Sequence, residues 1–153
     1  MDQDKVLREH LLELLGSGSA HISLEAALGD FPMEDINARA DCSPHTAWQL
    51  LEHLRLAQWD ILDFSTNSKY REMTFPDDYW PQDQGTPETW SESLKQVLGD
   101  LESMRDLVSN PETDLFAKIP HGSGQTILRE SLLVADHNAY HLGQLMLIKK
   151  SLS

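Results

Sequence analysis

Residues 124–145 of the chain, GQTILRESLLVADHNAYHLGQL, carry the most informative pattern in the sequence. Their apolar residues recur at steps of three and four, which is the spacing of a helix with one buried face. The pattern predicts a helix that starts near Thr126 and runs through Ile148, with Lys149 and Lys150 suited to the dipole at its C-terminal end. Two histidines lie in the middle of this helix, so the same stretch also contains the first candidate site.

His137 and His141 lie four positions apart, which places their side chains about 40° apart around the helix axis and about 6 Å apart along it. Both imidazoles can therefore reach one point, and this spacing is how a helix offers two nitrogen ligands to one metal ion. The alternative is a pair of surface histidines, or of core histidines with ordinary hydrogen-bond partners. A third ligand elsewhere in the chain decides between these interpretations.

A second long helix supplies the best candidate for that ligand. Ser43 followed by Pro44 is typical of a helix start, and apolar residues keep helical spacing from there to about Phe64. His53 lies near the middle of this helix among apolar neighbours, where a polar ring is expected to have a hydrogen-bond partner or a ligand. Three imidazoles on two helices make a shared metal ion a simpler explanation than separate core histidines. The other histidines fall at helix edges or in loops: His10, His21, His45 and His121.

Three neutral imidazoles without a thiolate predict a divalent ion that keeps its charge and at least one position for water. This donor set is more typical of catalytic sites than of structural ones, because the ion can activate a bound water or deprotonate a thiol. Zinc, nickel and iron all accept imidazole, so the identity of the metal stays open. Glu130, Asp60 and Gln144 share helix faces with the histidines and are candidates to orient them; the alternative is a solvated charge or a packing amide.

Two further helices complete an all-α pattern. One is predicted from Asp4 to Leu15, and another starts at Thr86 and Pro87 and continues to about Asn110. Residues 23–28 suit one or two short turns, and no stretch alternates apolar and polar residues long enough for a strand. We therefore expect residues 1–153 to form one domain, a four-helix bundle.

Residues 65–85, STNSKYREMTFPDDYWPQDQG, separate the second and third main helices. A loop of this length without a repeating pattern usually crosses the fold, covers a site, or both. A helix of about 20 residues is about 30 Å long, and an extended chain covers that distance in about nine residues. The loop can therefore return along the whole bundle, which predicts an up-down-down-up order with a long crossover.

Composition excludes several kinds of partner. The chain has 153 residues, of which 40% are hydrophobic, and its 12 basic and 25 acidic residues give a formal net charge of -13. Such a surface repels phosphate backbones and anionic lipids, so neither nucleic acid nor a membrane is an expected partner. The single cysteine, Cys42, cannot close an intrachain disulfide, and the polar N-terminus lacks the pattern of a secretory signal. We therefore expect a cytoplasmic protein.

Residues 43–64, SPHTAWQLLEHLRLAQWDILDF, together with residues 124–145 resemble the DinB superfamily, and the resemblance spans nearly the whole chain. The most specific element is DHNAYHLGQL, with two histidines four apart followed by Gly-Gln. The resemblance implies an up-down-down-up four-helix bundle, a metal bound by His53, His137 and His141, and commonly a homodimer. The superfamily is related to bacillithiol and mycothiol S-transferases and to a thiol-dependent maleylpyruvate isomerase, although many members have no assigned reaction.

Three functions remain as hypotheses. The first is a metal-dependent S-transferase or hydrolase that activates a low-molecular-weight thiol or water against an electrophilic small molecule, with Tyr79 or Trp80 as a pocket wall and Glu130 or Gln144 orienting the metal site. Few basic residues are available to hold an anionic thiol, which counts against bacillithiol; they are Arg55, Arg71 and Arg129. The second is a non-enzymatic stress module that binds a metal or ligand in a dimeric bundle. The third is a structural bundle without metal.

Overall fold

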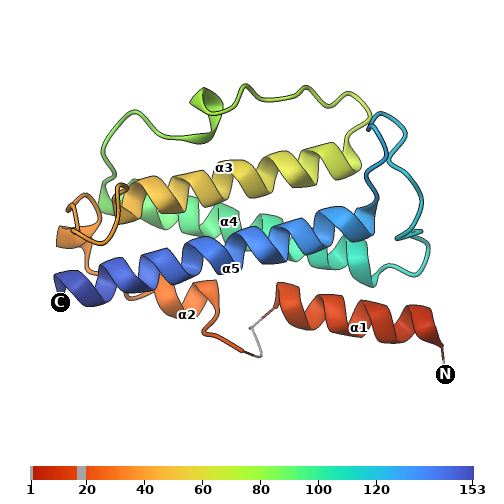
Figure 1. The fold of residues 1–153 in the computed structure, drawn as a ribbon, viewed down its shortest axis with the longest axis horizontal. Helices are drawn as coiled ribbons and strands as arrows, with labels where there is room; N and C mark the ends of the chain where they lie inside the picture. Colours follow the sequence, from red (N-terminus) through yellow and green to blue (C-terminus); the bar gives the residue numbers. More distant parts are fainter. Residues whose placement is uncertain (1, 17–19) are drawn as a thin grey trace.

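The computed structural model describes residues 2–16 and 20–153 of the chain. Four main helices pack side by side as a bundle (Figure 1): α1 (Gln3–Leu15), α3 (Ala47–Thr66), α4 (Pro87–Ser109) and α5 (Ile127–Leu152). The connections contain a short helix and two 3-10 turns: α2 (Leu24–Leu28), η1 (Met33–Asp35) and η2 (Asp77–Tyr79). Within the described residues there is no strand, only an isolated bridge between Lys118 and Thr126. The predicted all-α four-helix bundle is confirmed.

The order of the helices is up-down-down-up, as predicted. Figure 1 shows α3 and α4 running in the same direction, with the connection between them returning along the outside of the bundle. Helices α1 and α5 run in the opposite direction, so α3 and α5 are antiparallel neighbours. This arrangement brings the middle of α3 next to the middle of α5, where the candidate histidines lie.

Helix α3 begins later than the sequence pattern predicted. The predicted cap at Ser43 and Pro44 is wrong, because Thr46 is the N-cap: its side chain accepts a hydrogen bond from the Gln49 amide, and the Gln49 side chain accepts one from the Thr46 amide. This reciprocal capping box satisfies two amide groups at once. The Ser43 hydroxyl instead binds the backbone of His45 in the preceding turn. The predicted starts of α4 at Thr86 and α5 near Thr126 are correct.

The crossover between α3 and α4 is anchored to the start of α3. The Trp48 indole nitrogen donates a hydrogen bond to the Asp83 carbonyl, and the Asn37 side chain bonds both the amide and the carbonyl of Gly85. A Cβ atom added to Gly85 would come within 2.5 Å of the Trp48 ring, so the close approach requires glycine there. The crossover is therefore a fixed wall of the bundle.

Two tyrosines fix the middle of the crossover onto α3. The hydroxyl groups of Tyr70 and Tyr79 donate to the two carboxylate oxygens of Asp60, over 2.9 and 2.6 Å. Asp60 itself is buried. These bonds hold η2 over the face of α3 that carries His53, so the loop covers the candidate site as expected. In the described part of the chain, no helix is long and apolar enough to cross a membrane.

Candidate metal centre

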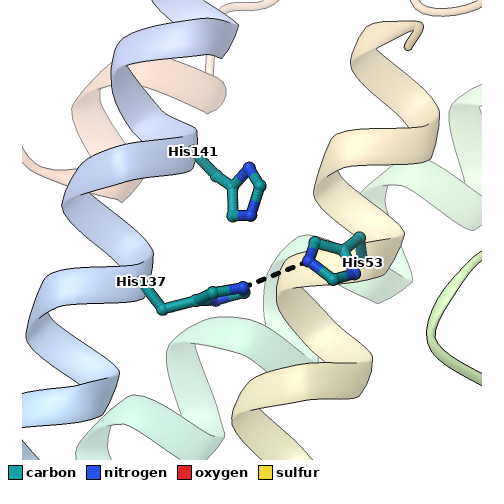
Figure 2. Close-up of side chains that lie close together, drawn as sticks. All are labelled: His53, His137 and His141. Carbon is teal, nitrogen blue, oxygen red and sulfur yellow. Dashed lines mark hydrogen bonds between the residues drawn. The ribbon is translucent and has the colours of Figure 1, made fainter. Parts of the chain in front are cut away.

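Three histidines meet between α3 and α5 (Figure 2). His53 comes from α3, while His137 and His141 lie one turn apart on α5 and point toward it. One ligand nitrogen from each ring lies within 4.8 Å of the others, and the Nε2 atoms of His53 and His137 are 3.1 Å apart. The cluster predicted from helix spacing is therefore present, and the antiparallel packing of the two helices creates it.

The spacing of these nitrogens fits a shared metal ion. Bonds of about 2.1 Å to one ion hold two nitrogens about 3.4 Å apart in a tetrahedral site and about 3.0 Å apart in an octahedral one. The observed 3.1 Å between the Nε2 atoms of His53 and His137 falls within this range. The donor set is all imidazole, which suits zinc, nickel and iron alike. His53 and His137 therefore already have the spacing of two metal ligands, and His141, whose ligand nitrogen lies within 4.8 Å of theirs, completes a donor set that fits a divalent ion.

Hydrogen bonds orient two of the three rings. His53 donates from Nδ1 to the Tyr79 carbonyl over 2.9 Å, and His141 donates from Nδ1 to the Gln144 side-chain oxygen over 2.6 Å. With its proton on Nδ1, each ring presents the Nε2 lone pair to the cluster, which is the form that binds metal. The Nδ1 atom of His137 is buried and has no hydrogen-bond partner among the described residues.

The electrostatic environment keeps the cluster neutral. Burial, and to a smaller extent the neighbouring imidazoles His141 and His53, lower the pKa of His137 to about 4. Burial also lowers the pKa of His53 and His141 below the usual value for histidine. At neutral pH all three rings are therefore uncharged, which is the form that binds metal. With the proton of His53 on Nδ1, the hydrogen bond between the two Nε2 atoms places the proton of His137 on Nε2, and a metal ion bound there would displace it to Nδ1.

Aromatic side chains cover the cluster. The Trp80 ring stacks on His53 with centroids 4.0 Å apart and planes 3° from parallel, and it also stacks on His45 at 4.0 Å. Trp80 thus lies directly against the cluster, while the expectation that Tyr79 or Trp80 forms a pocket wall stays a prediction. The stacking of Trp80 on His45 was not predicted, because His45 precedes α3 and only the folded crossover brings Trp80 to it. No spacing in the sequence indicates that contact.

The three candidates for orienting the histidines have different positions. Gln144 contacts His141 directly, as its helical spacing predicted. Glu130 is buried two turns before His137 and accepts a hydrogen bond from Arg129 rather than from a cluster histidine. Asp60 binds the tyrosines of the crossover, so it reaches His53 only through Tyr79. A catalytic role for Glu130 or Gln144 stays a prediction.

A four-helix bundle with a buried cluster of three histidines between two antiparallel helices defines a class of helical proteins with a potential metal centre. The sequence profile of the DinB superfamily matches residues 20–145. This match covers most of the chain, which therefore belongs to the DinB superfamily, and the resemblance seen in residues 43–64 and 124–145 is confirmed. No curated protein and no solved structure matches the chain.

Proposed function

We propose that His53, His137 and His141 bind one divalent metal ion, and that the protein uses it to activate a small thiol or water against an electrophilic substrate. The observation that carries this proposal is the convergence of three neutral imidazoles on one point. When bound, the ion would act as a Lewis acid that lowers the pKa of the attacking group. Zinc and nickel are the first candidates, and iron also accepts these ligands.

The chain's own residues prepare the site in three ways. The Tyr79 carbonyl and Gln144 keep the Nε2 lone pairs of His53 and His141 directed at the cluster. The stacked Trp80 excludes water from one side of His53. Burial lowers the pKa of His137 to about 4, so its ring stays neutral and able to bind metal at neutral pH.

Two of the three arginines considered from the sequence are already paired, which argues against a strongly anionic thiol. Arg55 forms an ion pair with Glu52, and Arg129 forms one with Glu130, so both guanidinium groups are already paired with carboxylates. A thiol with several negative charges would have to displace these partners. A small thiol of low charge, or water, is therefore the nucleophile that this site favours.

The metal is tested first by elemental analysis of protein purified without a chelator or an affinity tag. We expect about one divalent ion per chain in the wild type and none in His137→Ala. The matched control is His121→Ala, which changes an exposed histidine outside the cluster and should leave the metal content unchanged. Full retention of metal in His137→Ala would contradict the assignment.

Catalysis is tested with metal-loaded protein and the His141→Ala variant. Conjugation of small thiols to a panel of electrophiles is compared with hydrolysis of simple esters and amides. A metal-dependent rate in one panel identifies the nucleophile, because the metal should supply the main electrostatic stabilisation. Equal rates in both proteins would contradict the enzymatic function.

The second candidate function is a non-enzymatic metal- or ligand-binding module. The observation that favours it is the cover over the cluster: His53 and His141 are 6% and 8% exposed, and Trp80 lies flat against His53. A covered site limits the access of a substrate. Stoichiometric metal together with no metal-dependent rate in either panel would favour this candidate over the enzyme.

A further inference from the structure

A cavity of about 480 Å³ lies between α3, α5, the crossover and the loop before α5, and no histidine of the cluster lines it. Asp60 lies seven residues after His53, and Glu130 lies seven residues before His137. Because α3 and α5 are antiparallel, both carboxylates are displaced from the cluster in the same direction along the bundle, by about 10 Å. Their cavity is therefore a separate compartment two helical turns from the histidines. Its volume is in the usual range for small-molecule sites.

The cavity is lined by more negative than positive charge. Its carboxylates are Asp60, Glu72 and Glu130, and its one guanidinium group belongs to Arg129. Asp60 and Glu130 are 8% and 2% exposed, and burial of charged carboxylates is costly unless something compensates them. Both oxygens of Asp60 already accept hydrogen bonds from Tyr70 and Tyr79, so Glu130 is the carboxylate that needs a further partner. The lining therefore carries more negative than positive charge, and its two buried carboxylates lie beside a cavity that is open to solvent.

Glu130 is only partly compensated. Its Oε1 atom accepts a hydrogen bond from Arg129 over 2.7 Å, whereas its Oε2 atom receives none from the residues that the structure describes. The Arg129 side chain is 56% exposed, so solvent weakens its hold on the buried carboxylate. Glu130 is thus a nearly fully buried carboxylate at the cavity wall with one oxygen free to accept a donor.

Aromatic rings form another part of the wall. Phe64 packs against Tyr70 and His121 with ring centroids 5.2 and 5.3 Å apart. His121 donates from Nε2 to the Phe64 carbonyl, which fixes its ring in the wall. Aromatic rings beside carboxylates are a combination that binds organic cations, because both the ring faces and the carboxylates attract positive charge.

We propose that this cavity binds an organic amine, a molecule with an ammonium group on a flat or apolar body. The ammonium group lies between Asp60 and Glu130, and the body lies against the aromatic wall. Tyr79 connects this compartment to the histidines, since its hydroxyl binds Asp60 and its carbonyl accepts the His53 proton. Only the role of the amine as substrate rests on the proposed function; its binding needs no metal.

The test is calorimetric titration of chelator-treated protein with three molecules of similar shape: phenethylamine, phenethyl alcohol and hydrocinnamate. These carry a positive, a neutral and a negative group on the same phenyl body. We expect the amine to bind at least about tenfold more tightly than the alcohol, because charge-assisted hydrogen bonds are worth that much or more. Hydrocinnamate should bind most weakly.

Substitutions in the cavity lining should change the affinity for the amine in opposite directions. Asp60→Asn and Glu130→Gln should each weaken amine binding about tenfold. Arg129→Gln should strengthen it, because this removes the cation that competes for Glu130. The matched control is Arg55→Gln, which breaks a similar ion pair outside the cavity and should leave amine binding unchanged. If a carboxylate variant fails to fold, Arg129→Gln still tests the proposal, because stronger amine binding in that variant supports it and unchanged binding contradicts it.

Two outcomes would overturn the proposal. Equal binding of the amine and the alcohol would show that the carboxylates do not select charge. Tighter binding of hydrocinnamate, lost in Arg129→Gln, would show an anion site instead. His137→Ala separates this proposal from the metal centre, because that variant should lose metal and still bind phenethylamine.

Discussion

Acidification of the metal-free protein should destabilise its fold through His137. Burial lowers the pKa of this side chain to about 4, whereas its ordinary value is 6.5. As the pH falls below 6.5, the His137 side chain of the unfolded chain binds a proton. In the folded chain the same side chain stays unprotonated until the pH approaches about 4. The unfolded state then binds more protons than the folded state, so stability decreases with falling pH in this window.

The size of the effect follows from the two pKa values. The complete difference corresponds to about 3 kcal/mol, reached when the pH falls below the folded pKa. Between about pH 7 and about pH 5, most of the unfolded chains gain the proton while the folded form stays neutral. The expected loss from His137 in that interval is about 2 kcal/mol.

Urea unfolding in the presence of a chelator measures this loss. The wild type and His137→Gln are each unfolded at about pH 7 and about pH 5, and the change in unfolding free energy is compared. Groups that do not contact His137 titrate alike in both proteins and cancel, so the wild type should lose about 2 kcal/mol more than His137→Gln. The control variant is His10→Gln, which changes an exposed histidine. Its unfolding free energy should decrease between about pH 7 and about pH 5 by the same amount as that of the wild type. An equal loss in the wild type and in His137→Gln would refute the reasoning.

Three other properties can be predicted. Arg8→Met should lower the unfolding free energy by about 3 kcal/mol, measured by urea unfolding, because the buried guanidinium group donates to the carbonyls of Val108, Asn110 and Thr113 and no apolar side chain replaces those bonds. Gly85→Ala should cost about 1 to 3 kcal/mol and alter tryptophan fluorescence, since the added methyl group meets the Trp48 ring. We also expect a homodimer; light scattering should return about twice 17.3 kDa, and a mass near 17.3 kDa at micromolar concentration would contradict it.

The parts of the fold that depend on local spacing could be predicted from the sequence. Helical periodicity predicts α5, and a four-residue spacing places His137 and His141 on one face, because both depend only on helix geometry. The start of α3 was misplaced because Ser43 and Thr46 are both good caps, and only the reciprocal bond with Gln49 decides between them. Thr46-Ala-Trp-Gln49 has the capping-box pattern of a hydroxyl residue followed three positions later by Gln, so the sequence did contain this signal, and the Ser-Pro pair was preferred over it.

The contacts of the crossover could not be predicted, because they join residues that are distant in the sequence and are not related by helical spacing. The loop length indicated that residues 65–85 return along the bundle, but not which side chains would meet α3. The hydroxyl groups that bind Asp60 and the stacking of Trp80 on His53 depend on where the returning chain lies. The cavity at Glu130 depends on the same path, so it too appears only in the folded protein.

The distribution of the three histidines along the chain has a consequence for the order of assembly. His137 and His141 become neighbours as soon as one turn of α5 forms, whereas His53 lies 84 residues before His137. A metal ion captured early by the two local ligands would stabilise that turn without closing a loop. Recruiting His53 would then close a long loop, whose entropic cost the ion and the helix packing must offset together. The ion would therefore bind weakly to His137 and His141 at first and tightly once His53 joins them, so tight metal binding would indicate that the chain has finished folding.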